Sequence, residues 1–161
     1  SGTVFISSKK FGMDPNNALH AFAHADGGWR PDGVHALGGS CNKWLCDDIL
    51  KTTDYAAEQQ DITPEKLGRN HVYFLPYLMG ERSPINDTNA RGTFIGMTMD
   101  TTRSDLVQAV LEGVAFAIRD SFEVARSLGL DIPSTKICGG GSKSPLWRTI
   151  FATSWASPWS C

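Results

Sequence analysis

The sequence predicts a domain of the α/β class with a mixed sheet, and three observations support this class. Short β-prone segments come first, helical and strand-like segments then alternate, and one long segment has helical periodicity. Such an order is typical of α/β domains. With 161 residues, 41% of them apolar and 20% charged, the chain can bury a core and has an ordinary globular composition.

Three strands are predicted in the first part of the chain. Residues 3–6, 19–24 and 34–37 are β-prone, whereas residues 26–28 and 30–33 have the composition of turns. No turn or cap precedes the first strand. We therefore expect that part of the domain is missing upstream.

The middle of the chain predicts two helices and a buried strand. The run Gly38-Gly39-Ser40 opens a helix to about residue 51, with Trp44, Leu45 and Ile49 placed for one apolar face. A shorter helix is predicted over residues 54–60. Residues 72–76 read as a buried strand, and an ordered loop should continue from there to residue 91.

The clearest predicted helix covers residues 104–128, where apolar residues recur at helical spacing and Gly129 follows. The pair Glu112-Gly113 interrupts it. A glycine in a helix interior permits close approach of another element, so we interpret this pair as a close contact with another helix.

The strongest local signal for function is the run GGGSKSPLWR at residues 139–148, which follows a predicted strand at 135–138. Backbone N–H groups and the dipole of a helix start favour phosphate or ribose hydroxyls, and Pro145 suits the first turn. The run lacks both the Walker ending and the Rossmann spacing. It indicates either a nucleotide site of another kind or a turn that only packs a helix on a sheet.

Composition excludes several classes of protein. The net charge is −2 and no basic cluster is present, so duplex nucleic acid is not an expected partner. No apolar run is long enough to span a membrane, and no signal peptide is visible. The cysteines at 41, 46, 138 and 161 match neither a metal knuckle nor a disulfide framework, which predicts buried thiols and a cytoplasmic protein.

Four segments together resemble the FGGY family of carbohydrate kinases. LPYLMGERSP at 75–84 is similar to a segment of these kinases, and GTFIGM at 92–97 with DLVQAVLE at 105–112 fits the family's second signature. GSCNKW at 39–44 resembles its glycine-led helix, and the triple glycine with Ser144 and Trp147 resembles its adenosine motif. The wording PYLxGERxP, followed by NARG at 89–92, most resembles the xylulokinase branch.

This resemblance implies a truncated C-terminal domain, over residues 1–152, with the ribonuclease-H-like fold of actin-like ATPases. Such kinases transfer the γ-phosphoryl group of ATP, with Mg²⁺, to a sugar hydroxyl, here of a ketopentose such as D-xylulose. Kinases of glycerol, gluconate or a ribulose remain alternatives. A non-catalytic module that binds nucleotide or a partner on the same fold also remains open.

The resemblance also assigns site residues. Gly39 and Lys43 would flank ATP from one helix, and Gly140, Gly141 and Ser144 would hold the adenosine from the other side. Lys43 has an equally good interpretation as a solvated helix charge.

Other polar residues are interpreted as structural. Glu81 and Arg82 form a tempting catalytic pair, but we interpret them as an ion pair that orders a long loop. The histidines at 20, 24, 35 and 71 show no ligand spacing, so no metal site is predicted from them.

The family's catalytic aspartate precedes a phosphate loop, of which Ser1 and Gly2 resemble the last two residues. The aspartate and the N-terminal domain, with most sugar contacts, are therefore expected upstream of Ser1. We predict that this polypeptide alone transfers no phosphate.

Residues 153–161, TSWASPWSC, depart from the family's usual continuation. Deleting one nucleotide from a sequence that encodes Asp-Ile-Leu-Gly-Leu-Pro-Leu-Glu-Leu reproduces them, which suggests a frameshift at position 153. We therefore expect the helix after Pro145 to end early. Apolar sheet surface left uncovered by truncation predicts self-association into a homo-oligomer.

Overall fold

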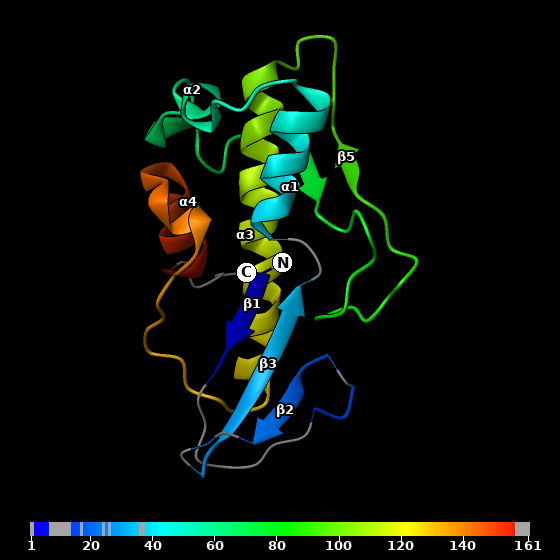
Figure 1. The fold of residues 1–161 in the computed structure, drawn as a ribbon, viewed down its shortest axis with the longest axis vertical. Coiled ribbons are helices and arrows are strands. Elements are labelled where there is room, and N and C mark those ends of the chain that lie inside the picture. Colours follow the sequence, from blue (N-terminus) through cyan, green and yellow to red (C-terminus); the bar gives the residue numbers. More distant parts are fainter. Residues whose placement is uncertain are drawn as a thin grey trace.

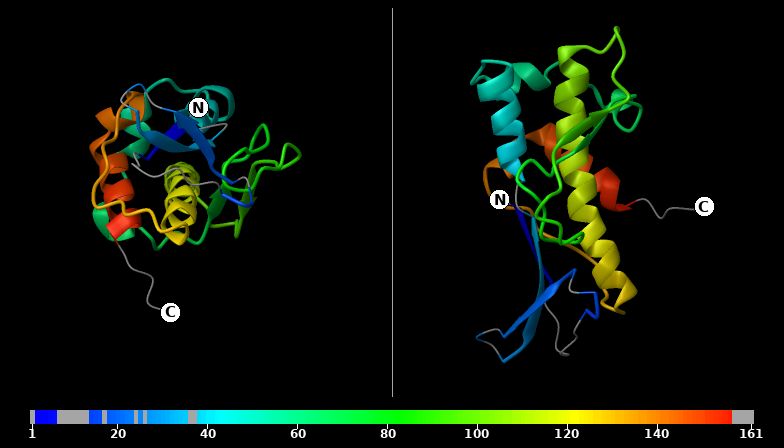
Figure 2. Two further views of the ribbon diagram at one scale, coloured as in Figure 1. Left: turned by 90° about the horizontal axis from the view of Figure 1, so that it is seen from below. Right: turned by 90° about the vertical axis from the view of Figure 1, so that its right-hand side faces the viewer.

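The structure is a computed structural model that describes residues 2–6, 14–16, 18–23, 25, 27–35 and 38–156. It confirms the predicted α/β class. The long helix α3 (Arg103–Ser127) runs along the molecule, with a three-stranded sheet at one end (Figure 1). Helix α4 and strand β4 pack against different sides of α3, and α1 lies between them (Figure 2).

The three-stranded sheet consists of β1 (Gly2–Phe5), β2 (His20–Ala23) and β3 (Trp29–His35), in the order β1-β3-β2. The first two predicted strands are confirmed. The prediction of a turn at residues 30–33 is wrong, because these residues lie inside β3. Antiparallel pairing on both sides of β3 overrides their local turn preference.

Helix α1 (Gly39–Trp44) continues directly into a π-helical segment, η1 (Leu45–Ile49), as the predicted helix requires. Cys41, Leu45 and Cys46 are buried, but Ile49 is 53% exposed. Its predicted place on the apolar face is therefore wrong. A π-helical turn contains an extra residue, which shifts the buried face relative to an α-helix.

The short predicted helix is confirmed as α2 (Tyr55–Gln59). The Asp54 side chain caps it by accepting a hydrogen bond from the Ala57 N–H at 3.0 Å. A single 3₁₀ turn, η2 (Pro64–Lys66), follows before the next strand.

Strands β4 (Tyr73–Leu75) and β5 (Thr93–Ile95) form a separate antiparallel pair. Phe74 points into the core, whereas Tyr73 and Leu75 are exposed, so the predicted buried strand is buried on one face only. Both described sheets are antiparallel, and the parallel pairing expected of a mixed sheet is not among the described strands.

Helix α3 begins at a capping box, in which Thr102 and Asp105 each bind the other's backbone, and Gly129 follows it with φ of 80°. The interpretation of Gly113 as a helix–helix contact is wrong. A Cβ atom there would lie 2.1 Å from the carbonyl oxygen of Phe74, so the close neighbour is strand β4.

The strand predicted at residues 135–138 is absent, since this described segment has no regular structure. Nothing in the described chain pairs with it, and local β-propensity alone does not form a strand. Cys138 is consequently exposed, which corrects its predicted burial. A 3₁₀ turn, η3 (Gly140–Lys143), then leads into helix α4 (Pro145–Ala156).

Helix α4 continues through the first residues of the atypical tail, so the expectation that it ends early is wrong. The Arg119 guanidinium donates a hydrogen bond to the Ser154 carbonyl oxygen at 2.7 Å. The ring centroid of Trp155 lies 4.9 Å from the ring centroid of Phe122 and 5.2 Å from that of Phe151. Residues 157–161 lie outside the described part.

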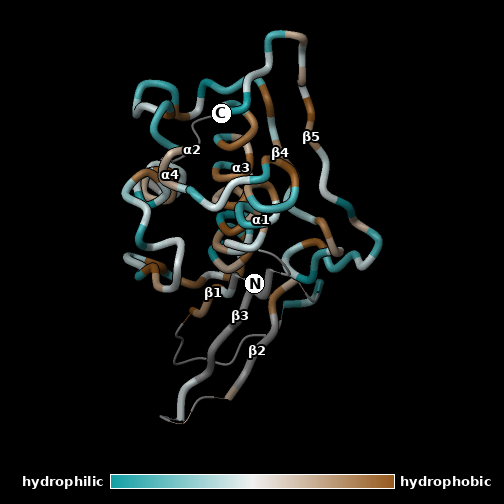
Figure 3. The backbone as a smooth tube through the Cα atoms, turned by 45° about the horizontal axis from the view of Figure 1, so that its top comes forward, coloured by the Kyte–Doolittle hydropathy of each residue, from teal (hydrophilic) through white to brown (hydrophobic). Residues whose placement is uncertain are grey.

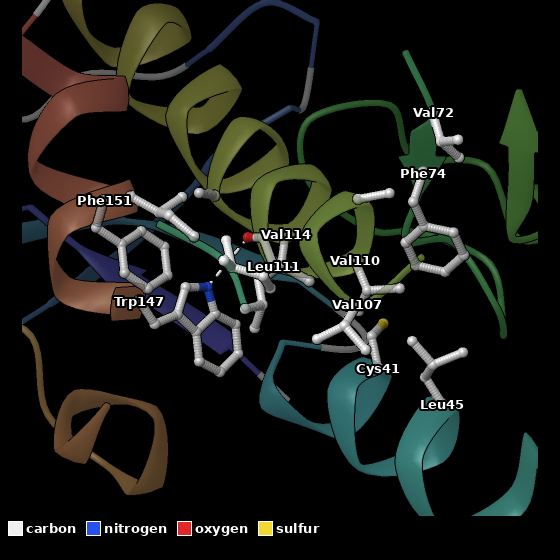
Figure 4. Close-up of a cluster of buried hydrophobic side chains, with 14 residues drawn as sticks. Cys41, Leu45, Val72, Phe74, Val107, Val110, Leu111, Val114, Trp147 and Phe151 are labelled. Atoms are coloured by element: carbon white, nitrogen blue, oxygen red, sulfur yellow. Dashed lines mark hydrogen bonds between the residues drawn. The ribbon is translucent and has the colours of Figure 1, made fainter. Parts of the chain in front are cut away.

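The main core lies where α1, α3, α4 and β4 meet, and Figure 4 draws 14 of its residues and labels ten of them. Hydrophobic residues follow α3 and β4, and hydrophilic residues follow most of the loops (Figure 3). None of the helices in the described residues is long and apolar enough to cross a membrane.

Candidate functional site

The indole ring of Trp147 brings the two glycine motifs together. A Cβ atom on Gly39, the first residue of α1, would lie 3.9 Å from Cη2 of this ring. A Cβ atom on Gly141 would lie 2.9 Å from its Cε3 and Cζ3 atoms. Two backbone segments separated by about a hundred residues in sequence therefore meet at one ring, and Gly141 has no room for a side chain.

Trp147 itself is held rigidly. Its ring is buried and stacks on Phe151, with ring centroids 5.6 Å apart. Its Nε1–H donates to the carbonyl oxygen of Leu111 in α3 at 3.1 Å (Figure 4). Because the ring is bonded to α3 and lies against Gly39 and Gly141, it fixes both glycine motifs in position relative to α3.

The turn that contains Gly139, Gly140 and Gly141, which we call the glycine turn, leaves backbone atoms accessible to a ligand at Gly140. Gly139 has φ of 91°, a conformation that glycine adopts without strain, and a Cβ atom on Gly140 would meet nothing within 4 Å. The turn is closed by its own polar groups, since Ser142 Oγ donates to the Gly139 carbonyl at 2.7 Å and Arg148 donates to the Ser142 carbonyl at 2.8 Å. A ligand can approach the backbone at Gly140 without a steric obstacle.

Ser144 caps helix α4. Its Oγ atom accepts a hydrogen bond from the Trp147 N–H at 3.1 Å and donates one to Gln59 Oε1 at 2.7 Å. The cap leaves the N-terminus of a twelve-residue helix beside the glycine turn. A helix N-terminus favours negative charge and hydroxyl ligands.

Lys43 lies one turn after Gly39 in α1, and its side chain is 67% exposed. It forms an ion pair with Asp47, whose other carboxylate oxygen accepts a hydrogen bond from the Tyr55 hydroxyl at 2.8 Å. The hydrogen bond with Asp47 raises the pKa of Lys43, and the same bond lowers the pKa of Asp47. Lys43 is therefore a charged, accessible group on the same helix as Gly39.

Gly2, one of the two residues that resemble a phosphate-loop remnant, begins β1 and pairs with His35 of β3. His35 precedes Gly39 by four residues, so the start of β1 and the start of α1 lie at the same end of the sheet (Figure 1). Two residues named in the sequence analysis, Ser1 of the phosphate-loop remnant and His24 of the four histidines, lie outside the described residues.

Glu81 belongs to the framework of its loop. Its side chain is buried, with 3% exposure, and Oε1 accepts a hydrogen bond from the backbone N–H of Arg82 at 2.8 Å. Its backbone N–H also bonds the Asp87 carbonyl at 2.8 Å. These contacts agree with an ordering role, in which the Glu81 carboxylate binds the backbone of Arg82.

The described residues contain no group of three or more His, Cys, Asp or Glu side chains that could hold a metal ion. Magnesium in nucleotide sites is commonly bound by one or two carboxylates together with the substrate phosphates. The described residues form no carboxylate cage for Mg²⁺.

Sequence reasoning missed Gln59 and the central place of the Trp147 ring. Trp147 belongs to the run at residues 139–148 and could be recognised from the sequence, whereas its approach to Gly39 could not. Gln59 gives no signal in the sequence, because its bond to Ser144 joins residues 85 positions apart.

Known proteins resemble this chain in sequence and in fold. Residues 1–155 match the model of the FGGY family of carbohydrate kinases, C-terminal domain. The chain is 36% identical over 157 residues to a xylulose kinase of Escherichia coli, covering 94% of this chain and 31% of that protein. A glycerol kinase of Enterococcus faecalis is 34% identical over 136 residues, which cover 82% of this chain and 27% of the kinase.

Among solved structures, a xyloylose kinase from Brucella ovis superposes with a TM-score of 0.86 at 39% identity, over 95% of this chain and 31% of that one. The chain therefore spans about a third of the length of such relatives. By its sequence and its fold, it belongs to the FGGY family of carbohydrate kinases and matches the C-terminal domain of that family.

Proposed function

We propose that this chain supplies the adenosine side of the ATP site in a kinase that phosphorylates a ketopentose such as D-xylulose. The observation that carries the proposal is the meeting of Gly39 and Gly141 at the Trp147 ring, beside the open backbone of Gly140. The choice of sugar is supported by the xylulose kinases among its relatives.

In this proposal each part of the site has one task. The open backbone at Gly140 and the capped start of α4 contact the adenosine, and Lys43 attracts the phosphates from α1. Phosphoryl transfer depends mainly on positioning and on charge stabilisation, with a carboxylate accepting the hydroxyl proton. That carboxylate is expected upstream of Ser1, so the chain by itself binds nucleotide without transferring phosphate.

Two alternatives to this proposal remain, one with another substrate and one that is not an enzyme. A kinase of glycerol, gluconate or a ribulose remains an alternative for the parent protein, and the glycerol kinase relative favours keeping it. A non-catalytic module that binds nucleotide, or only a partner, is the other. Absence of nucleotide binding would favour the partner-binding form.

A titration with a fluorescent ATP analogue tests the nucleotide site. We expect saturable binding that unlabelled ATP competes away, and a weaker affinity for Lys43→Ala. Lys136→Ala is the matched control, because Lys136 is also an exposed lysine but lies before the glycine turn. An equal loss in both variants would show only a general effect of charge, and no binding by the unaltered chain would overturn the proposal.

A coupled assay for ADP release, with D-xylulose present, tests the inactivity of the isolated chain. We expect no sugar-dependent turnover; measurable turnover would contradict the placement of the catalytic carboxylate upstream of Ser1.

Cellular location and oligomeric state remain predictions. A cytoplasmic location is supported by Cys41 and Cys46, which carry thiols rather than disulfides. Self-association is supported by the exposed apolar side chains of Tyr73, Leu75 and Ile95 on the β4–β5 pair. Sedimentation velocity over a range of concentrations tests it.

A further inference from the structure

A hydrogen bond joins helix α2 to the glycine turn. Gln59, in the last turn of α2, accepts the Ser144 Oγ–H on its Oε1 atom at 2.7 Å. Both side chains are half-buried. This bond connects helix α2 directly to Ser144, the cap of α4.

The bond determines what Ser144 can offer to a ligand. A serine hydroxyl has one proton and two lone pairs. Here the proton is donated to Gln59, and one lone pair accepts the Trp147 N–H at 3.1 Å. Ser144 is left with one acceptor lone pair and no donor.

The amide of Gln59 supplies the missing donor. Its Oε1 atom is occupied by Ser144, whereas its Nε2 group has no hydrogen bond among the described residues. A primary amide nitrogen carries two N–H donors. Ser144 and Gln59 therefore present an acceptor beside a donor.

The rest of α2 holds Gln59 in place. The neighbouring Glu58 accepts two hydrogen bonds from the guanidinium of Arg103, at 2.7 and 2.6 Å, and Arg103 also donates to the Leu50 carbonyl at 3.1 Å. On the other side, Tyr55 donates to Asp47, the partner of Lys43. Helix α2 thus connects the ion pair between Lys43 of α1 and Asp47 of η1 with Ser144, which follows the glycine turn.

We propose that Gln59 is a positioning and specificity residue of the nucleotide site, orienting the Ser144 hydroxyl and pairing with it to select adenine over guanine. On the base edge that carries N7, adenine has an amino donor beside a ring-nitrogen acceptor, whereas guanine has two acceptors, O6 and N7. An acceptor–donor pair on the protein matches this edge of adenine, and on guanine its acceptor would face another acceptor. This inference rests on the nucleotide site proposed above.

The test compares ATP and GTP binding by calorimetry for the unaltered chain, Gln59→Leu and Gln59→Glu. Gln60→Leu is the matched control, because Gln60 is the next residue and is exposed. Loss of one neutral hydrogen bond should weaken ATP binding by about fivefold in Gln59→Leu. GTP binding should change little, so the preference for ATP falls, while Gln60→Leu keeps it.

Two comparisons separate positioning from general structural support. Gln59→Glu retains an acceptor for the Ser144 proton but lacks the N–H donors, so its preference for ATP should also fall. In a Ser144→Ala background, Gln59→Leu should have a smaller effect than in the unaltered chain, because its partner is already absent.

The outcomes distinguish this inference from the proposed function. If the unaltered chain binds ATP but Gln59→Leu keeps the affinity and preference of Gln60→Leu, the role of Gln59 is overturned and the nucleotide site stands. Equal weakening of ATP and GTP in both Gln59 variants also overturns the specificity role. If the unaltered chain binds neither nucleotide, the proposed function fails and this inference fails with it.

Discussion

Replacing Gly113 by alanine tests the packing that holds the site together. Helix α3 crosses β4 so closely that a Cβ atom on Gly113 would lie 2.1 Å from the Phe74 carbonyl oxygen, 3.1 Å from its carbonyl carbon and 3.3 Å from its Cβ. Ordinary contacts between heavy atoms are about 3.5 Å. The obstacle is backbone rather than a flexible side chain, so helix and strand must move apart.

The magnitude follows from two opposing effects. Overpacking a well-packed core costs about 1–3 kcal/mol, and a backbone obstacle places this site at the upper end of that range. Alanine is more favourable than glycine inside a helix by about 1 kcal/mol. The net expectation is a loss of about 2 kcal/mol in the free energy of unfolding, or a fall of roughly 4–8 °C in Tm.

Urea unfolding followed by tryptophan fluorescence measures this loss, with the slope of the transition expected to stay constant. Gly140→Ala is the control, since a Cβ atom there would meet nothing within 4 Å and its φ is not positive. If Gly113→Ala were as stable as the unaltered chain, or more stable through its higher helix propensity, α3 and β4 could not approach as closely as described.

Three further results are expected. Gly140→Ala should weaken ATP binding without changing stability, because its new methyl group would cover open backbone; calorimetry and urea unfolding on one sample check both. Trp147→Phe should lower the free energy of unfolding by about 1–2 kcal/mol, because the hydrogen bond to the Leu111 carbonyl is lost; a Tm unchanged from the unaltered chain would exclude that bond. Burial, reinforced by the charge of Glu81, raises the pKa of Cys41 from 9.0 to about 12. The folded state then keeps a proton that the unfolded state loses, so stability should fall as the pH rises from 9.0 toward about 12, and Cys41→Ala should flatten that slope.

Elements governed by local interactions could be predicted. Helix α3 follows from its apolar periodicity, and its start is encoded by Thr102 and Asp105, which bond each other three residues apart. The cap of α2 by Asp54 is equally local. The glycine run at 139–141 could be recognised as a turn from its composition, because consecutive glycines mark turns.

Predictions failed where pairing between distant segments decides. Pro31 and Gly33 look like turn residues, yet β3 is a strand because β1 and β2 pair with its two edges. Residues 135–138 look like a strand, yet no described segment pairs with them. A strand is formed by its neighbours as much as by its own residues.

The sequence by itself therefore determined the family, the long helix and the identity of the glycine motifs, since each is encoded within a short stretch of chain. Only the tertiary structure decided that Gly39 and Gly141 share the Trp147 ring, that Gly113 faces β4, and that Gln59 binds Ser144. Each of these contacts joins residues far apart in sequence, and the order of the residues alone does not specify which of them will meet in space.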